Sequence, residues 1–253
     1  MSQSSDAPAA KESESGATLS AETPRLAAAI NSELALMQLA DSALPTGAFS
    51  HSLGFESYMQ RGDIEGEAGF SQWLTMFVDQ QLTFTDALAI RLVYQCSSFD
   101  EVRELDRLVT AQALPEQVRD AGITMGKRLL DIGHSSYPGP WLDRYHAGVH
   151  KGDLSSHPAL VWAVIVRDLR VDVDKAVAAH VYATVIALTQ NAVRGIPLGQ
   201  NTGQRVIRQA QTWVERAVER SATLDRDDLG AVSPGLEIAQ MQHQQQLARL
   251  FMS

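Results

Sequence analysis

Seven histidines are spread along the chain, and two of them stand at a spacing that suits a metal ion. His146 and His150 are four residues apart, so on a helix both imidazoles lie on one face. Imidazole favours nickel or zinc, and His157 or Asp153 would complete the ligand set. The glutamate of a zinc-protease helix is absent, and Gly148 lowers the helix propensity between the two histidines. Surface histidines are the simpler interpretation, so we assign no metal site and keep His146, His150 and His157 as candidates.

A glycine pair in the middle of the chain resembles a phosphate-binding loop. The segment Gly122-Ile123-Thr124-Met125-Gly126-Lys127-Arg128 is one residue too short, and Arg128 stands where a serine or threonine must hold magnesium. No predicted strand precedes it. We interpret the segment as a helix face whose small residues allow close packing, and we predict no nucleotide site.

Candidates for nucleophilic catalysis are equally weak. Ser50 and Ser52 flank His51, but adjacent residues point away from one another on a helix. There is no Gly-x-Ser-x-Gly elbow. The single cysteine, Cys96, lies on an apolar helix without a partner, which indicates a core residue and excludes a disulfide or an all-cysteine zinc site. We predict no catalytic residue and no intrinsic cofactor, so a binding or scaffold role is favoured over an enzyme.

The charge balance is acidic, with 30 acidic against 21 basic residues and a formal charge of −9. That balance disfavours nucleic acid as a partner, because phosphate binding needs a basic face. The acidic group Asp225, Asp227 and Asp228 lies in a polar connector without apolar walls, which indicates solvated side chains.

Apolar spacing of three and four residues predicts an all-α protein of about ten helices in a single compact bundle, with no strand. We expect a disordered acidic tail at residues 1–24, a helical domain at 25–234 and a C-terminal docking helix at 235–253. The expected helices lie near residues 34–40, 50–61, 70–82, 86–96, 102–109, 115–133, 141–150, 158–169, 174–192, 202–222 and 236–251, with Asp172 or Asp174 as N-cap of the ninth.

No segment carries the signature of export or of a membrane span. The first 25 residues lack the apolar core of a signal peptide. The most apolar stretches, 158–166 and 176–188, are shorter than the roughly 20 residues that a bilayer requires. A soluble, cytoplasmic protein without a membrane partner is therefore expected.

Two breaks between helices are unusually rich in turn residues. In the first, Pro45 and Gly47 form a turn in which Gly47 supplies a positive φ, and Ser50 caps the following helix. In the second, Gly195, Pro197 and Gly199 stop a long buried helix before polar amides restart the next one.

In order along the chain, these breaks resemble the urease accessory protein UreF family. The resemblance rests on Gln-Leu-Ala-Asp-Ser-Ala-Leu-Pro at 38–45, Phe-Ser-His-Ser at 49–52, Gly-Phe-Glu at 54–56 and the segment 191–204. His157-Pro158 and Arg249-Leu250-Phe251 add weaker agreement. Ala48 departs from the pattern, since the family more often has a second glycine there. The resemblance extends from about Leu34 to the end of the sequence.

The resemblance implies an all-helical homodimer that acts as a urease maturation factor. Such proteins bind UreD (also called UreH), recruit the GTPase UreG and assist delivery of nickel, the cargo of the complex, to the urease apoprotein. The alternative is a helical metallochaperone that binds nickel directly through His146 and His150. The residues expected to bind partners are Arg194, Gln200, Leu236, Met241, Leu247, Leu250 and Phe251. For the apolar members, a terminal helix that docks in a groove of UreD and one that closes its own core both remain open.

Overall fold

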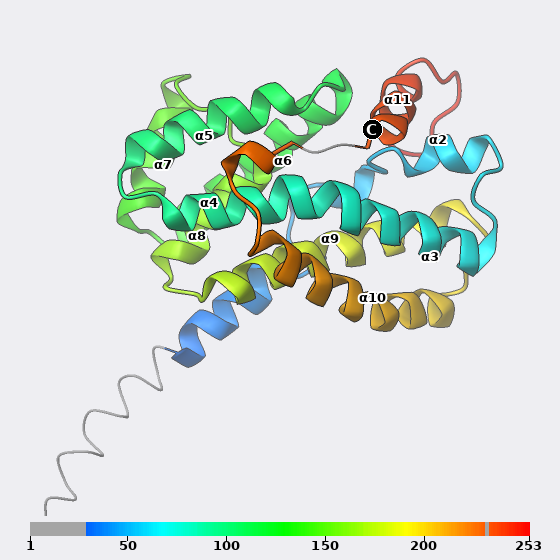
Figure 1. Cartoon of the computed structure of the whole chain (residues 1–253), viewed down its shortest axis with the longest axis horizontal. Coiled ribbons are helices and arrows are strands. Elements are labelled where there is room, and N and C mark those ends of the chain that lie inside the picture. Colours follow the sequence, from blue (N-terminus) through cyan, green and yellow to red (C-terminus); the bar gives the residue numbers. More distant parts are fainter. Residues whose placement is uncertain (1–28, 231–232) are drawn as a thin grey trace, which may run out of the picture.

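The computed structural model describes residues 29–230 and 233–253, and within them it contains helices and no strand (Figure 1). The all-α prediction with about ten helices is confirmed, whereas the predicted tail at 1–24 lies outside the described residues. A helix at 29–39 comes first. It is followed by η1 (Ala48–Ser50), α2 (Phe55–Gln60), α3 (Gly66–Met76), η2 (Phe77–Ala87), α4 (Leu88–Gln95), α5 (Phe99–Gln112), α6 (Glu116–Ser136), α7 (Pro140–His150), α8 (Pro158–Asp168), α9 (Val173–Gly195), α10 (Gln200–Ser221), η3 (Arg226–Asp228) and α11 (Pro234–His243).

One long helix crosses the molecule where the sequence predicted two. Helices α3 and α4 are joined without a break by η2, a π-helix over Phe77–Ala87. The wider π turn leaves room for the buried hydroxyl of Thr83 to donate to the carbonyl of Val78, five residues earlier, at 2.8 Å. In Figure 1 this helix runs through the middle, with α10 packed along it on one side and α5 along its α4 end on the other.

Helix α8 is the centre of the core. All residues from Ala159 to Val166 are at most 2% exposed, so the helix is apolar on every side, as expected for a fully buried helix. It is surrounded by α4, α6, α7 and α9. Close contact of α6 with the loop that leads into α8 depends on glycine, because a Cβ at Gly126 would lie 1.7 Å from the carbonyl oxygen of Ser156. The interpretation of residues 122–128 as a helix face with small residues is confirmed.

Helix α9 begins where predicted, since the Asp172 carboxylate accepts from the backbone N–H groups of Asp174 and Lys175 at 2.9 and 3.3 Å. It runs for 23 residues, and by length and composition it could cross a membrane, so the expectation that every apolar stretch is too short is wrong. The helix packs against α4, α8, α10 and η2. That packing accounts for its apolar character by burial within the protein.

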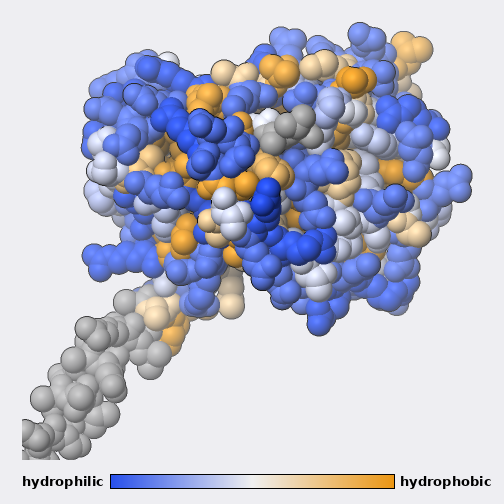
Figure 2. Space-filling model, in the orientation of Figure 1, coloured by the Kyte–Doolittle hydropathy of each residue, from blue (hydrophilic) through white to orange (hydrophobic). Residues whose placement is uncertain are grey.

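The last helix is shorter than predicted. Helix α11 ends at His243, and residues 244–253 are not helical, whereas the sequence indicated a helix to 251. In Figure 1, the end of the chain lies beside α11 and α2. The same face is mostly hydrophilic and carries separate groups of hydrophobic residues (Figure 2).

Candidate functional site

The turn after the first helix depends on glycines with a left-handed backbone. Gly47 has φ of 91° and Gly54 has φ of 98°, which confirms the predicted positive φ at Gly47. A Cβ at Gly47 would lie 2.4 Å from the guanidinium of Arg128, so the turn, which contains Pro45, also presses on α6. The predicted cap at Ser50 is wrong: Ser50 ends η1, and Gly54 is the N-cap of α2.

The second break lies where the sequence placed it. Helix α9 ends at Gly195, Pro197 follows, and Gly199 is the N-cap of α10. A Cβ at Gly195 would lie 3.3 Å from the sulfur of Met59 and 3.5 Å from the ring of Phe251. The glycine therefore lets the last turn of α9 approach both α2 and the end of the chain.

The two breaks, far apart in the sequence, contact one another directly. The side-chain amide of Asn191 donates to the backbone carbonyl of His51 at 2.7 Å. The Arg194 guanidinium donates to the carbonyl of Phe49 and lies 5.8 Å from its ring and 5.6 Å from the ring of Phe251. Arg194 is thus held within this chain by its head group while the residue as a whole stays exposed.

The end of the chain closes the same region. The backbone N–H of Met252 donates to the carbonyl of Ser50 at 2.7 Å. The carbonyl of Ser253 accepts from the Ser52 hydroxyl at 2.8 Å and from the backbone N–H of Leu53 at 3.1 Å. We call this meeting of residues 47–56, 191–199 and 250–253 the three-segment junction.

Glu56 is a buried carboxylate of the junction. Its carboxylate accepts from the backbone N–H groups of Leu250 and Phe251 at 2.6 and 3.1 Å and pairs with His243 Nε2 at 2.8 Å. Both side chains of the Glu56–His243 pair are 1% exposed. A buried carboxylate is tolerated only with such partners, so this residue specifies the path of the final segment.

Of the apolar residues expected to bind a partner, some are buried in this chain and others are exposed. Leu236 and Phe251 are 1% and 7% exposed and close the core of this chain. Leu247 is fully exposed, Leu250 is 66% exposed and Met241 is 44% exposed. The predicted helix to residue 251 is wrong, because α11 ends at His243. The backbone N–H groups of Leu250 and Phe251 donate to the Glu56 carboxylate and not to helical carbonyls.

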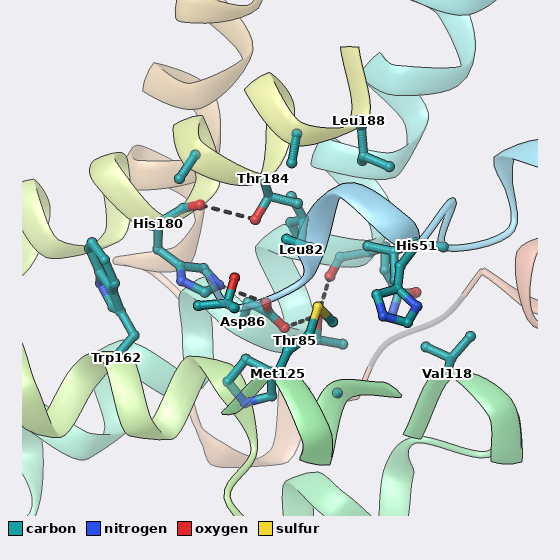
Figure 3. Close-up of a pocket in the computed structure, with 18 of the residues that line it drawn as sticks. His51, Leu82, Thr85, Asp86, Val118, Met125, Trp162, His180, Thr184 and Leu188 are labelled. Carbon is teal, nitrogen blue, oxygen red and sulfur yellow. Dashed lines mark hydrogen bonds and ion pairs between the residues drawn. The ribbon is translucent and has the colours of Figure 1, made fainter. Parts of the chain in front are cut away.

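A cavity of about 540 Å³ lies beside the junction. It is lined by side chains from η2, α6 and α9 and by both breaks, including His51, Arg194 and Gln200. In Figure 3, Asp86 lies beside His180 in the lining, with Oδ2 and Nε2 2.8 Å apart. Trp162 lies beside His180, while Met125 and Val118 of α6 line another side.

Burial and neighbouring charges shift the pKa values of two titratable groups in the cavity. Burial alone would raise the pKa of the Asp86 carboxyl, but the hydrogen bond and charge of His180 bring this pKa below its ordinary value. Burial lowers the pKa of His157, helped by the charge of His180 and opposed by Asp86 and Asp106. Relative to the free groups, the cavity therefore favours the ionised form of the Asp86 carboxyl and the neutral form of the His157 imidazole.

The serine–histidine segment contacts the end of the chain. His51 Nδ1 contacts the hydroxyl of Ser253 at 2.8 Å, and the Ser52 hydroxyl donates to a backbone carbonyl. No carboxylate is paired with the His51 ring within the described residues, so the orienting group of a catalytic triad is missing there.

Two of the three histidine candidates for a metal site lie together, and the third lies elsewhere. His146 and His150 lie together on α7, with their Nε2 atoms 3.0 Å apart, and Asp131 of α6 joins them. His157 is the N-cap of α8, accepting from the backbone N–H of Ala159 at 3.3 Å, and it lines the cavity instead. Its inclusion with His146 and His150 is wrong, because the loop before α8 places it at the cavity and outside their cluster.

Several residues of the site were missed from the sequence. Glu56 and Asn191 stand inside the two quoted segments, so their polar character amid apolar neighbours was an available signal. Asp86, His180 and Asp131 lie on separate helices, and no local pattern connects them. Their partners follow only from the packing of the helices.

These features define an all-helical protein organised around a junction of three chain segments that leaves apolar side chains of the last segment exposed. The family model described as UreF matches residues 64–211. Over 225 residues, the chain is 64% identical to the urease accessory protein UreF of Kocuria rhizophila, covering 87% of this chain and 96% of the relative.

Other relatives extend the similarity. The identity is 58% over 220 residues with the urease accessory protein UreF of Corynebacterium efficiens, which covers 87% of this chain and 96% of the relative. It is 40% over 227 residues with that of Bacillus sp., which covers 88% of this chain and the whole relative. The chain belongs to the UreF family of urease accessory proteins.

Proposed function

We propose that this chain is a soluble, cytoplasmic urease maturation factor that scaffolds UreD (UreH) and the GTPase UreG on the urease apoprotein during nickel incorporation. It acts as a homodimer, holds no intrinsic cofactor and carries out no reaction itself; nickel is the cargo of the assembly. Family membership supports the role in maturation. The observation that carries the scaffold role is the exposed apolar set Met241, Leu247 and Leu250 on an otherwise anchored segment.

The anchoring makes that set suitable for binding. Leu250 is 66% exposed although its backbone N–H is bound by buried Glu56, so the side chain is presented at a fixed position. Presenting apolar side chains from an ordered segment lowers the entropy lost on association. Arg194 lies beside Phe251, the residue that follows Leu250, and supplies a polar group near this surface. Gln200 lines the neighbouring cavity together with Arg194.

The experiment is co-purification of the full chain with UreD, and then with UreG in the presence and absence of GTP. The double variant Leu247→Ser/Leu250→Ser should reduce capture of UreD at least tenfold, since two exposed leucines bury on docking. Leu114→Ser is the matched control, because Leu114 is 57% exposed in the connection between α5 and α6. Equal capture by the double variant and the control would overturn the docking surface, and absence of UreD capture by the unmodified chain would overturn the scaffold.

The second candidate function is direct binding of nickel by this chain through His146 and His150. It is favoured by one observation, the 3.0 Å separation of the two Nε2 atoms. It differs from the scaffold in requiring metal affinity in the isolated chain.

A further inference from the structure

Four metal-binding side chains gather where α6 and α7 pack together. His146 and His150 lie one turn apart on α7, and Asp131 and His134 lie on the facing surface of α6. His146 Nε2 is 3.0 Å from His150 Nε2 and 3.6 Å from an oxygen of Asp131. The three donor atoms of Asp131, His146 and His150 all lie within 4.8 Å of one another.

The 3.0 Å separation of His146 and His150 is that of neighbouring ligands around one ion, and the 3.6 Å separation of His146 and Asp131 is slightly longer. Nitrogen and oxygen ligands bind transition metals at about 2.0–2.2 Å, which places neighbouring ligand atoms about 3.0–3.5 Å apart. Two imidazole nitrogens facing each other can share only one proton. A cation between them would instead accept a lone pair from each nitrogen and from the carboxylate.

The ligands project from a helix that is firmly held. Between the histidines, Gly148 is buried, and a Cβ there would lie 2.6 Å from Leu154, so this glycine allows close packing and does not interrupt α7. Tyr145, next to His146, is fully buried and donates to Asp106 at 2.5 Å. Ligands on a rigid element lose little freedom when a metal binds.

His134 constrains the central ligand. Its ring lies flat on that of His146, with centroids 3.9 Å apart and planes at 5°. Its Nε2 lies 3.2 Å from the carboxylate of Asp143, which fixes the ring from the other side. The stack restricts rotation of His146 toward solvent.

We propose that Asp131, His146 and His150 form a surface site for a borderline divalent transition-metal ion such as Ni²⁺ or Zn²⁺. Two imidazoles and one carboxylate suit these ions, whereas Mg²⁺ and Ca²⁺ prefer oxygen ligands alone. Asp131 and His150 are exposed, so solvent occupies the remaining coordination positions and the ion exchanges readily. The site deepens the second candidate function, to which it adds Asp131 as a third ligand. It is separate from the three-segment junction and does not depend on the scaffold function.

The test is equilibrium dialysis and titration calorimetry of the full chain, freed of any histidine tag, with Ni²⁺ and with Zn²⁺. We expect one ion per chain at this site and no competition from excess Mg²⁺. His146→Ala/His150→Ala should weaken binding at least a hundredfold, and Asp131→Asn about tenfold. Asp153→Asn is the matched control, since Asp153 is an exposed carboxylate just beyond α7 and outside the cluster, and it should leave the affinity unchanged.

The outcomes separate the site from the rest of the protein. Circular dichroism of each variant should equal that of the unmodified chain, because the ligands lie at the surface. Absence of Ni²⁺ and Zn²⁺ binding, or binding that survives the double histidine variant, overturns the site. Loss with the histidines but not with Asp131→Asn overturns the three-ligand assignment. UreD capture, measured separately, reports on the scaffold and not on this site.

Discussion

At the scale of single residues, Glu56 shows how one buried carboxylate fixes a chain segment. Replacing it by alanine leaves two backbone N–H groups and His243 without their acceptor. We expect Glu56→Ala to lower the free energy of unfolding by about 3–5 kcal/mol and Glu56→Gln by about 1–3 kcal/mol. Urea denaturation measures both. Glu65→Gln, at an exposed glutamate, is the control and should stay within about 0.5 kcal/mol of the unmodified chain; equal stability of Glu56→Ala and this control would refute the assignment.

The lowered pKa of His157 predicts how the free energy of unfolding depends on pH. Burial lowers the pKa of its imidazole in the folded chain, and burial also lowers that of His51, followed by the charge of Arg128. As the pH falls, these histidines therefore bind protons at a higher pH in the unfolded chain than in the folded chain. Their contribution to stability is fully present above about pH 6.5 and is lost as the pH drops below that value. Urea midpoints between pH 8 and 5 measure this fall.

The matched variant is His157→Asn, which keeps a side-chain acceptor for the Ala159 N–H but removes the titrating group. Its stability should fall less between about pH 7 and pH 5 than that of the unmodified chain. Parallel curves for the two proteins would show that His157 does not contribute to the acid dependence.

At the scale of elements, local sequence predicted helix bodies better than helix ends. Asp172 caps α9 through its own side chain, so the start of that helix was visible in the sequence. The continuous α3–η2–α4 helix depends on a π turn, and the end of α11 depends on Glu56 about 190 residues earlier. Such ends are decided by contacts with distant residues, which override local propensity.

The candidate site was predictable to the same extent. The turn glycine Gly47 follows from local backbone geometry and was found. The pairing of Asp131 with His146 required the packing of α6 on α7, and the burial of His157 required the path of the loop before α8. The sequence identifies which residues are chemically able to act, whereas the fold decides which of them meet.

Removal of residues 244–253 tests the last element as a unit. The deletion uncovers buried Glu56 and removes Phe251, which is 7% exposed. We expect a lower free energy of unfolding, by about 3–5 kcal/mol, because a buried aromatic side chain and the partners of a carboxylate are lost together. Leu247→Ser/Leu250→Ser should leave stability within about 0.5 kcal/mol, since both leucines are exposed. Thermal and urea unfolding compare the two, and equal stability of the deletion and the double variant would contradict a structural role for the segment.

At the scale of the whole molecule, the described helices form a complete core around α8, and the helix at 29–39 belongs to it. Ala35 and Leu39 of that helix are 3% and 4% exposed. Residues 1–24 contain six serines and no aromatic residue, so they offer little apolar surface to bury. Deleting 1–24 should leave the melting temperature within about 1 °C and leave UreD capture unchanged.

Deleting 1–39 should lower the melting temperature by about 5 °C or more, because buried Leu39 alone corresponds to about 2–5 kcal/mol at about 2–4 °C per kcal/mol. Differential scanning calorimetry of the two deletions locates where the folded body begins, and a drop of several degrees with the shorter deletion would show that residues before 25 pack on it.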